Sequence, residues 1–538
     1  MDKEFDQLII FSSDKDFNLS DSYSDSYLYS IGPGNLNCRD LYVINDPIEL
    51  NKIAERIRDQ YSEWVFEQNH IFIENNLIHR NDLSMFFLTD FSCKRSEFFD
   101  TYNSVCNLIQ IQKKINVEGI KSVVFIGVSE AFVKTASQIF KNSTFEYIDV
   151  KKNKETFFRG FIKNSIYFTN MMIFCLFNLF FKSANRNHRR LYLTRYPLHF
   201  IDDDNLEDKY GEIDLKKDNF LVSIATDGFH QNVNPFEYLK YLNQCLSKGF
   251  SVLDLHIKFN DIILAFWEYL KLIPKWKKIA KKDYLFQEYD ISAFCRRELI
   301  FSLNRVVRLL LWDKPIRRFF TRIELEEFYY YLHEYPYGRL FTYILKSYPK
   351  IETTAMQSGP ASFRKMLYFL SREEIGNDKN YLQHVPAPEK ILAEDSHSGM
   401  IYSHAGYNNI EIMENIFRLK YLENITMSKP RFILICPGLH DGELMINSLR
   451  DEIINNPNKL YLIKPHPRGS KGYLRNNIFE NLEVSNIHIA KLLSQAEKVI
   501  VTYSSVGMEA KYLGIPTEVI NVPGIISESP LLDDYYQE

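Results

Sequence analysis

The C-terminal part of the chain alternates between short apolar runs and segments with helical periodicity. After residue 429 the runs RFILIC, LYLI, KVIV and PTEVI each end at turn residues, and helical segments follow the first three. Continuous apolar runs of this length are typical of parallel strands that helices cover on both faces. The alternation therefore predicts an α/β domain over residues 429–526, and it constrains the fold more than any other feature of the sequence.

The longer N-terminal part shows the same pattern less regularly. Residues 122–128, 191–197 and 220–228 are predicted strands that stop at turn residues, and an amphipathic helix follows the first of them. We expect an N-terminal α/β domain over residues 1–425 with a helical, basic insertion at about 240–330. The predicted fold class is α/β, with two Rossmann-like domains facing across a cleft.

Composition and charge narrow the class of protein. The chain has 538 residues, of which 45% are hydrophobic and 25% charged, as in ordinary globular proteins. Its 65 Lys and Arg residues against 69 Asp and Glu residues give a net charge of −4, so we expect no nucleic-acid partner. The seven cysteines form no CxxC pair, and the chain starts without a basic segment followed by an apolar run. Both features predict a cytoplasmic protein without a zinc site.

Two segments raise the question of membrane contact. Residues 166–181 form an apolar run of 16, shorter than the roughly 20 residues that span a bilayer, so a buried or interfacial helix is expected. Residues 262–322 hold 14 Lys and Arg against 6 Asp and Glu, interleaved with large aromatics such as Trp267 and Trp276. This pattern fits an interfacial helix near anionic lipid, or a solvated helix face whose aromatics lie in the core. Both interpretations stay open.

The first motif that carries chemistry is Lys464-Pro465-His466-Pro467-Arg468, directly after a predicted strand. The two prolines fix the backbone and prevent the strand from continuing, so the His side chain is held on a rigid turn. Three cationic or donor groups within five residues suit a phosphate group. A loop histidine that only bonds backbone groups is the alternative.

The second motif follows the strand KVIV and begins with Thr502. Ser504 and Ser505 precede a helix that is expected to end before Gly514, with Glu509 in its first turn. Serines at a helix N-terminus cap free N–H groups, and the same N–H groups attract a phosphate. Glu509 is placed to bond ribose hydroxyls. A purely structural capping role for one serine is expected.

Together these motifs resemble the nucleotide-binding domain of GT-B glycosyltransferases that build bacterial surface carbohydrate. The similarity is to the superfamily of bacterial sialyltransferases, Kdo transferases and CDP-glycerol polymerases. In those families an HP motif and a Ser motif hold the phosphate of a cytidine nucleotide. The resemblance covers roughly residues 430–520, where His466 and Pro467 match the HP motif and Ser504 and Ser505 match the Ser motif. Pro437 and Gly438 stand where such domains let the donor approach the backbone.

The resemblance extends weakly into the N-terminal domain. The loop Gln357-Ser358-Gly359 follows a strand-like segment, and many relatives have His where this chain has Ser358. The resemblance implies that this loop positions the donor or the acceptor. Sialyltransferases of this superfamily use the Asp of an acidic Gly motif as catalytic base, and Asp227-Gly228 matches half of that motif. Asp227 is therefore the expected base, with His230 and Asp208 as alternatives and a plain turn as the structural interpretation.

The implied function is transfer of an acidic ulosonic sugar from a CMP donor to a glycan or lipid-linked glycan acceptor. A single phosphate can be neutralised by His466, the serine hydroxyls and helix N–H groups, so no metal and no cofactor is expected. One alternative is a transferase of the same fold that uses CDP-glycerol or a UDP-sugar. Another is a non-catalytic protein of polysaccharide assembly. Peripheral contact with the cytoplasmic face of the inner membrane would suit a lipid-linked acceptor.

Overall fold

The computed structural model describes all residues of the chain except those in the ranges given next. These ranges are 1–4, 14–16, 97–98, 153, 182–187, 198–218, 226–232, 332, 358, 377–379, 414–418, 420–421, 424, 439–440, 467–468, 470–471, 476–478 and 535–538. Three sheets dominate the described residues, and every strand pair within these three sheets is parallel. The predicted α/β class is therefore confirmed.

The first sheet has five strands in the order β5-β3-β1-β8-β9. Their bounds are Leu41–Val43, Ser26–Ile31, Gln7–Ser12, Ser122–Ile126 and Thr144–Ile148. The helices of this unit are α1 (Pro47–Glu67), α2 (Asn69–Glu74), α3 (Thr101–Lys114) and α4 (Glu130–Ile139). Two short ladders lie beside them, β2 (Phe17–Asn18) with β4 (Leu36–Asn37) and β6 (Ile78–His79) with β7 (Leu83–Ser84).

The second sheet has seven strands in the order β12-β11-β10-β15-β16-β17-β18. Their bounds are Ser251–Val252, Asn219–Ser223, His188–Arg195, Leu325–Tyr331, Glu352–Met356, Lys390–Ala393 and Ile410–Ile412. The helices of this unit are α6 (Pro235–Ser247), α9 (Pro336–Leu345) and α10 (Ser396–His404).

The third sheet has five strands in the order β21-β20-β19-β22-β23. Their bounds are Leu482–Val484, Tyr461–Ile463, Phe432–Cys436, Ala496–Val501 and Thr517–Val519. Its helices are α11 (Gly442–Asn455), α12 (Ile489–Leu493) and α13 (Val506–Tyr512). The elements predicted after residue 429 are thus present, and the sequence pattern missed only the short edge strand β21.

All three sheets share one strand order. Renumbered within its own unit, each runs 3-2-1-4-5, and the second sheet continues with two further strands. This is the order of doubly wound, Rossmann-like sheets, in which ligands bind outside the carboxyl ends of the strands where the order reverses. The sequence predicted one α/β domain for residues 1–425, whereas the structure has two sheets within that range. The boundary between 425 and 429 stays a prediction.

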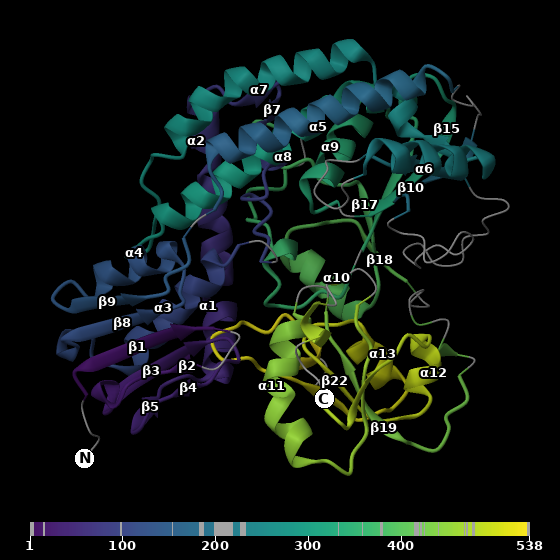
Figure 1. The fold of residues 1–538 in the computed structure, drawn as a ribbon. Coiled ribbons are helices and arrows are strands. Elements are labelled where there is room, and N and C mark those ends of the chain that lie inside the picture. Colours follow the sequence, from purple (N-terminus) through teal and green to yellow (C-terminus); the bar gives the residue numbers. More distant parts are fainter. Residues whose placement is uncertain are drawn as a thin grey trace.

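Three long helices lie together at the top of Figure 1. They are α5 (Phe157–Asn178), α7 (Phe259–Ile279) and α8 (Ser292–Phe320), beside the short hairpin β13 (Leu285–Phe286) and β14 (Tyr289–Asp290). Most of α8 is buried, as expected for a helix that others enclose. Trp276, Trp312, Phe319 and Phe320 are buried, so the core interpretation of the basic zone holds for these aromatics, whereas Trp267 is exposed.

The apolar core is arranged differently in the two parts of the chain. One large cluster spans the first two units and the long helices, and a small separate cluster covers the other face of the first sheet. The third sheet carries a separate cluster on each face. Six of the seven cysteines are buried and Cys38 is half-buried; none forms a disulfide.

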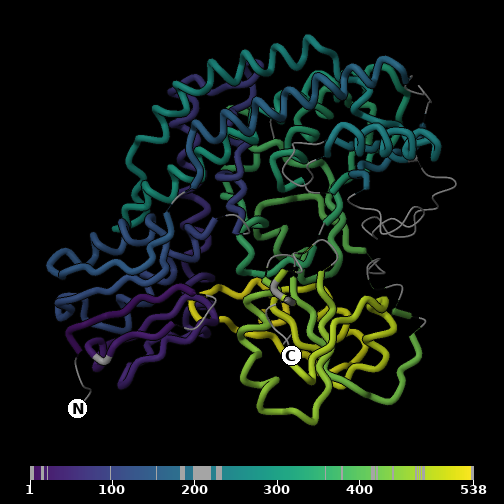
Figure 2. Tube along the Cα trace, viewed as in Figure 1, coloured from purple at the N-terminus to yellow at the C-terminus, as the bar shows by residue number. Residues whose placement is uncertain are grey.

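The chain after β23 returns from the third unit to the first (Figure 2). Pro523 O accepts a hydrogen bond from Gly32 N at 2.8 Å, and Gly524 O accepts one from Asn103 Nδ2 at 2.9 Å. Gly524 has φ +65°, and a Cβ there would lie 2.6 Å from Ser30 O, so this contact requires glycine. Further on, Arg364 Nε donates to Ser527 O at 2.7 Å, and the guanidinium pairs with Asp533 at 2.7 Å. The C-terminal segment thus joins the third unit to the other two.

Candidate active site

The predicted motifs meet at the carboxyl edge of the third sheet. Strand β19 lies between β20 and β22, with Ile435 paired to Ile463 on one side and Ile500 on the other. Pro437 follows β19, Lys464 follows β20 and Thr502 follows β22, so the three turns leave the sheet side by side. The point between β19 and β22 is also where the strand order reverses, the expected position of a ligand.

Lys464 and Glu509 approach this edge from different elements. Burial raises the pKa of the Cys436 thiol at the end of β19; the Glu509 carboxylate raises it further, whereas the Lys464 ammonium opposes the rise. Both charges therefore act on the same point of the edge. Glu509 is buried and lies in the first turn of α13, where the sequence predicted it. His466 is half-buried on the turn after β20.

The two serines are placed at the start of α13, but neither caps it through its hydroxyl. Ser505 is the N-cap residue, and its side chain makes no capping hydrogen bond. Ser504 contributes its backbone carbonyl, which accepts from Gly507 N at 3.1 Å. The expected structural capping role is therefore wrong for Ser505. Within the part of the chain that the structure describes, no hydrogen bond is made by either hydroxyl, and both side chains are half-buried.

Gly438 lies against a tyrosine of the neighbouring turn. A Cβ on Gly438 would lie 2.6 Å from the ring of Tyr503, so only glycine fits without moving that ring. Tyr503 follows Thr502, whose Oγ1 donates a hydrogen bond to Asp441 Oδ2. Asp441 precedes α11, so these contacts fix the turns after β19 and β22 relative to each other.

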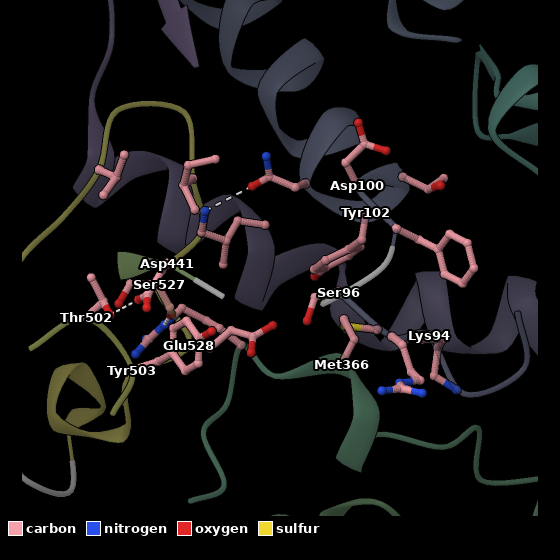
Figure 3. A pocket seen from close by; sticks show the side chains of 18 of the residues that line it. Lys94, Ser96, Asp100, Tyr102, Met366, Asp441, Thr502, Tyr503, Ser527 and Glu528 are labelled. Carbon is pink, nitrogen blue, oxygen red and sulfur yellow. Dashed lines mark hydrogen bonds between the residues drawn. The ribbon is translucent and has the colours of Figure 1, made fainter. Parts of the chain in front are cut away.

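A cavity of about 270 Å³ opens between this edge and the first unit (Figure 3). Asp441, Thr502 and Tyr503 line it from the third unit, with Ser527 and Glu528 of the returning segment beside them. From the opposite side it is lined by residues at and before the start of α3 and by others from α8 and the second unit, namely Lys94, Ser96, Asp100, Tyr102, Glu298 and Met366. Figure 3 shows the labelled residues of these two groups on opposite sides of the space.

Glu298 is a titratable group of this cavity whose pKa is shifted toward neutrality. It is buried on α8, accepts a hydrogen bond from Thr101 Oγ1, and burial raises its pKa from 4.5 to about 7. A carboxyl group that titrates near neutral pH can exchange a proton with a bound molecule. Lys94 lines the same side of the cavity, and burial lowers its pKa. The sequence pointed to neither residue, because they stand outside any motif and only the packing of α8 on the first unit joins them.

The third sheet also meets the carboxyl edge of the second sheet. Ser505 and Glu509 lie with Glu394, Asp395 and Ser398 around a small space of about 20 Å³. The Gln357 side chain holds this part of the second unit together, since its Nε2 donates to Gly359 O at 2.8 Å and to Ser398 Oγ at 3.0 Å, and its Oε1 accepts from Glu394 N at 2.9 Å. The Gln357 side chain thus holds the loop with Gly359 close to Glu394 and Ser398.

Several predicted residues lie outside the described residues. These are Asp208, Asp227, His230, Ser358, Pro467 and Arg468, so their positions relative to the site stay predictions. Among the described residues, no three His, Cys, Asp or Glu side chains form a group that could hold a metal ion.

Comparison with known proteins gives matches to solved structures only, and these matches have low sequence identity. No family model and no curated protein matches the sequence. UDP-N-acetylglucosamine 2-epimerase from Rickettsia bellii is 10% identical with a TM-score of 0.27, over 40% of this chain and 62% of that one, so the match spans less than two thirds of the epimerase. The glycotransferase of kitacinnamycin is 9% identical with a TM-score of 0.29, over 63% and 82%. The wall teichoic acid polymerase TagF is 12% identical with a TM-score of 0.28, over 70% and 86%.

The fold class rests on the strand orders described above, since superpositions at these TM-scores carry no argument on their own.

Proposed function

We propose that the protein is a nucleotide-sugar-dependent glycosyltransferase of GT-B type that binds its donor at the carboxyl edge of the third sheet. One observation carries the proposal: the turns with Gly438, with Lys464 and His466, and with Ser504 and Ser505 leave neighbouring strands at the point where the strand order reverses. Cationic, hydroxyl and backbone N–H groups at one such point form a phosphate site.

The donor of this proposal is a CMP-linked acidic ulosonic sugar, similar to sialic acid or Kdo. His466, Lys464 and the two serine hydroxyls neutralise the single phosphate as it leaves, while Glu509 bonds the ribose. An acceptor hydroxyl gives its proton to the base, and its oxygen forms the new bond to the anomeric carbon as the bond to the phosphate oxygen breaks. Asp227 matches the position of the base in the resembling sialyltransferases, and Glu298 is a described carboxyl group of the cavity whose pKa is raised to about 7.

The acceptor is a glycan or a lipid-linked glycan of bacterial surface polysaccharide, with the enzyme in the cytoplasm and in peripheral contact with the inner membrane. The cation-rich insertion and the clustered apolar side chains on α5 and α7 support the membrane contact. A donor such as CDP-glycerol or a UDP-sugar would use the same phosphate site, since the groups around it recognise phosphate rather than a base or a sugar.

Thermal unfolding with CMP, CDP, UDP and GDP tests the proposal. A nucleotide that binds only the native state adds about 2.7 kcal/mol at a hundredfold excess over Kd. We expect CMP to raise the melting temperature of the wild-type protein and of the control His70→Ala, whose histidine is exposed and distant in sequence from the motifs. We expect no rise for His466→Ala.

The other possible results of this thermal-shift experiment decide between the alternative functions. A larger shift with CDP or UDP would replace the CMP donor by the corresponding alternative. A CMP shift that survives in His466→Ala would remove His466 from the site. Absence of a shift with all four nucleotides would favour a non-catalytic protein of polysaccharide assembly.

A further inference from the structure

Helices α5 and α7 form an outer layer that covers the buried helix α8. They contact each other through aromatic side chains: the rings of Phe168 and Phe266 are 5.6 Å apart and those of Phe161 and Tyr269 are 6.2 Å apart. Lys277 Nζ lies 5.6 Å from the centre of the Phe157 ring, so the end of α7 lies beside the start of α5 and the two helices run antiparallel. Their inner faces are therefore fully used in packing on each other and on α8.

Their outer faces carry large apolar side chains that contact little else. Ten of the 24 exposed large hydrophobic residues of the described chain lie on these two helices or the turn after α5. They are Phe158, Ile162, Ile166, Met172, Leu176, Leu179, Phe180, Ile263, Leu264 and Trp267. Phe180 is 84% exposed, Phe158 73% and Trp267 57%. Positions 158, 162 and 166, and again 172, 176 and 180, recur at four-residue spacing, so they form one stripe along the helix.

Positively charged side chains lie at the border of this apolar stripe. The outer face of α7 changes from Ile263, Leu264 and Trp267 to the exposed Lys271 and Lys278, and no hydrogen bond or ion pair of these two ammonium groups occurs among the described residues. Because the helices are antiparallel, this basic half of α7 lies beside the start of α5, which carries Arg159 and Lys163. The combination of an exposed apolar stripe with lysines at its border is typical of helices that lie in a membrane interface.

Two other basic residues of this zone, Arg317 and Arg318, are used within the fold. Arg317 Nε lies 3.0 Å from Asp313 Oδ1, and Arg318 Nη2 lies 2.7 Å from Asp261 Oδ2. They join α8 internally and to the start of α7, so they are unsuitable for a test of membrane contact. Lys271 and Lys278 are the appropriate positions.

We infer that the outer faces of α5 and α7 together form a surface that docks on an anionic lipid bilayer, with both helices parallel to it. This lipid-facing surface consists of the ten apolar residues above with Lys271 and Lys278. Among the described residues no helix is both long and apolar enough to cross a bilayer, so the contact is peripheral. A second copy of the chain is a poorer occupant, because in a two-fold contact this surface would meet its own excess of cations. The inference deepens the membrane contact of the proposed function and rests on it.

Vesicle flotation of the full chain tests the inference. The vesicles are phosphatidylcholine alone, or phosphatidylcholine with roughly one third phosphatidylglycerol, whose headgroup charge attracts lysines near the surface. The test variant is Leu179→Ser/Phe180→Ser/Trp267→Ser. The matched control is Tyr42→Ser/Val43→Ser/Ile48→Ser, since these residues are similarly exposed but belong to the first unit.

We expect the wild-type protein and the control to float with the anionic vesicles, and the test variant to bind at least about tenfold more weakly. Lys271→Glu/Lys278→Glu should reduce binding to anionic vesicles and leave the weaker binding to phosphatidylcholine unchanged. Equal melting temperatures of the variants and the wild-type protein show that the fold is intact.

Absence of flotation with either vesicle, or equal weakening by the test and control variants, would overturn the inference. So would a wild-type dimer that the test variant converts to a monomer without any vesicle binding, since a second copy would then cover the surface. The CMP-induced thermal shift is measured without lipid, so failure of the nucleotide site is distinguished from failure of this surface.

Discussion

At the scale of single residues, the protonation of Glu298 makes the stability of the protein depend on pH. Its carboxyl group is buried on α8, and its pKa is raised from 4.5 to about 7. Between these two values the native state holds a proton that the unfolded state has released. The free energy of unfolding therefore falls as the pH rises through this window, by about 3 kcal/mol in all, and does not fall further above it.

Glu298→Gln should remove this dependence, because the amide stays neutral and its oxygen still accepts the Thr101 hydrogen bond. Melting temperatures at several pH values from 4.5 to 8 measure the effect. We expect the wild-type protein to lose stability relative to the variant as the pH rises through this window. Parallel curves for the two proteins would show that Glu298 does not titrate there.

The residues that the sequence revealed share one property: each stands within a few positions of a strand end. Gly438, Lys464, His466 and Ser505 were found because turns after parallel strands must lie at one edge of the sheet. Lys94 and Glu298 were not found, because no local pattern reports which distant segments pack together. The absence of a capping bond from Ser505 was equally hidden, since capping depends on backbone conformation as well as on residue type, and Ser505 has helical backbone angles (φ −58°, ψ −22°).

At the scale of elements, the junction of α8 with the first unit rests on a buried charged group. Asp90 and Arg305 are both fully buried, and Asp90 Oδ1 accepts from Arg305 and, at 3.2 Å, from Arg95 Nη1. Two cations therefore neutralise one carboxylate in the core. Removing the closer cation leaves a carboxylate that is incompletely paired in a dry site.

Arg305→Met should accordingly destabilise the protein by about 3–5 kcal/mol. The double variant Asp90→Asn/Arg305→Met should recover part of this loss, because the neutral amide needs no counter-charge. The midpoint of urea unfolding, followed by tryptophan fluorescence, measures both, since Trp276 and Trp312 lie on α7 and α8. A midpoint for Arg305→Met equal to that of the wild-type protein would contradict this account of the junction.

The sequence predicted elements best where strands are long and fully buried. Strand β19 has five buried residues, and its apolar run is unambiguous. Strand β21 has three residues with none fully buried, so its composition does not distinguish it from a loop. The two sheets of the N-terminal part were not separated, because their apolar residues join one continuous core, which no local sequence pattern reports.

At the scale of the whole molecule, the three units are held in one arrangement by the returning C-terminal segment. Arg364 bonds the backbone of Ser527 and Ser529 and pairs with Asp533, while Asp533 Oδ2 also lies 3.0 Å from His397 Nε2. This cluster joins the segment after β23 to the second unit, close to the face where Ser505 and Glu509 meet that unit. The carboxyl edge of the third sheet therefore borders both other units, as the proposed donor site would require in order to bring a donor and an acceptor together.

The central claim is that a nucleotide binds at the carboxyl edge of the third sheet. Hydrogen exchange of the full chain, with and without saturating CMP, tests the position of binding most directly. We expect slower exchange in peptides that cover residues 436–438, 464–466 and 502–510, whose amides lie at this edge. Protection confined to residues 126–132, the equivalent edge of the first sheet, or to no peptide at all, would contradict the account.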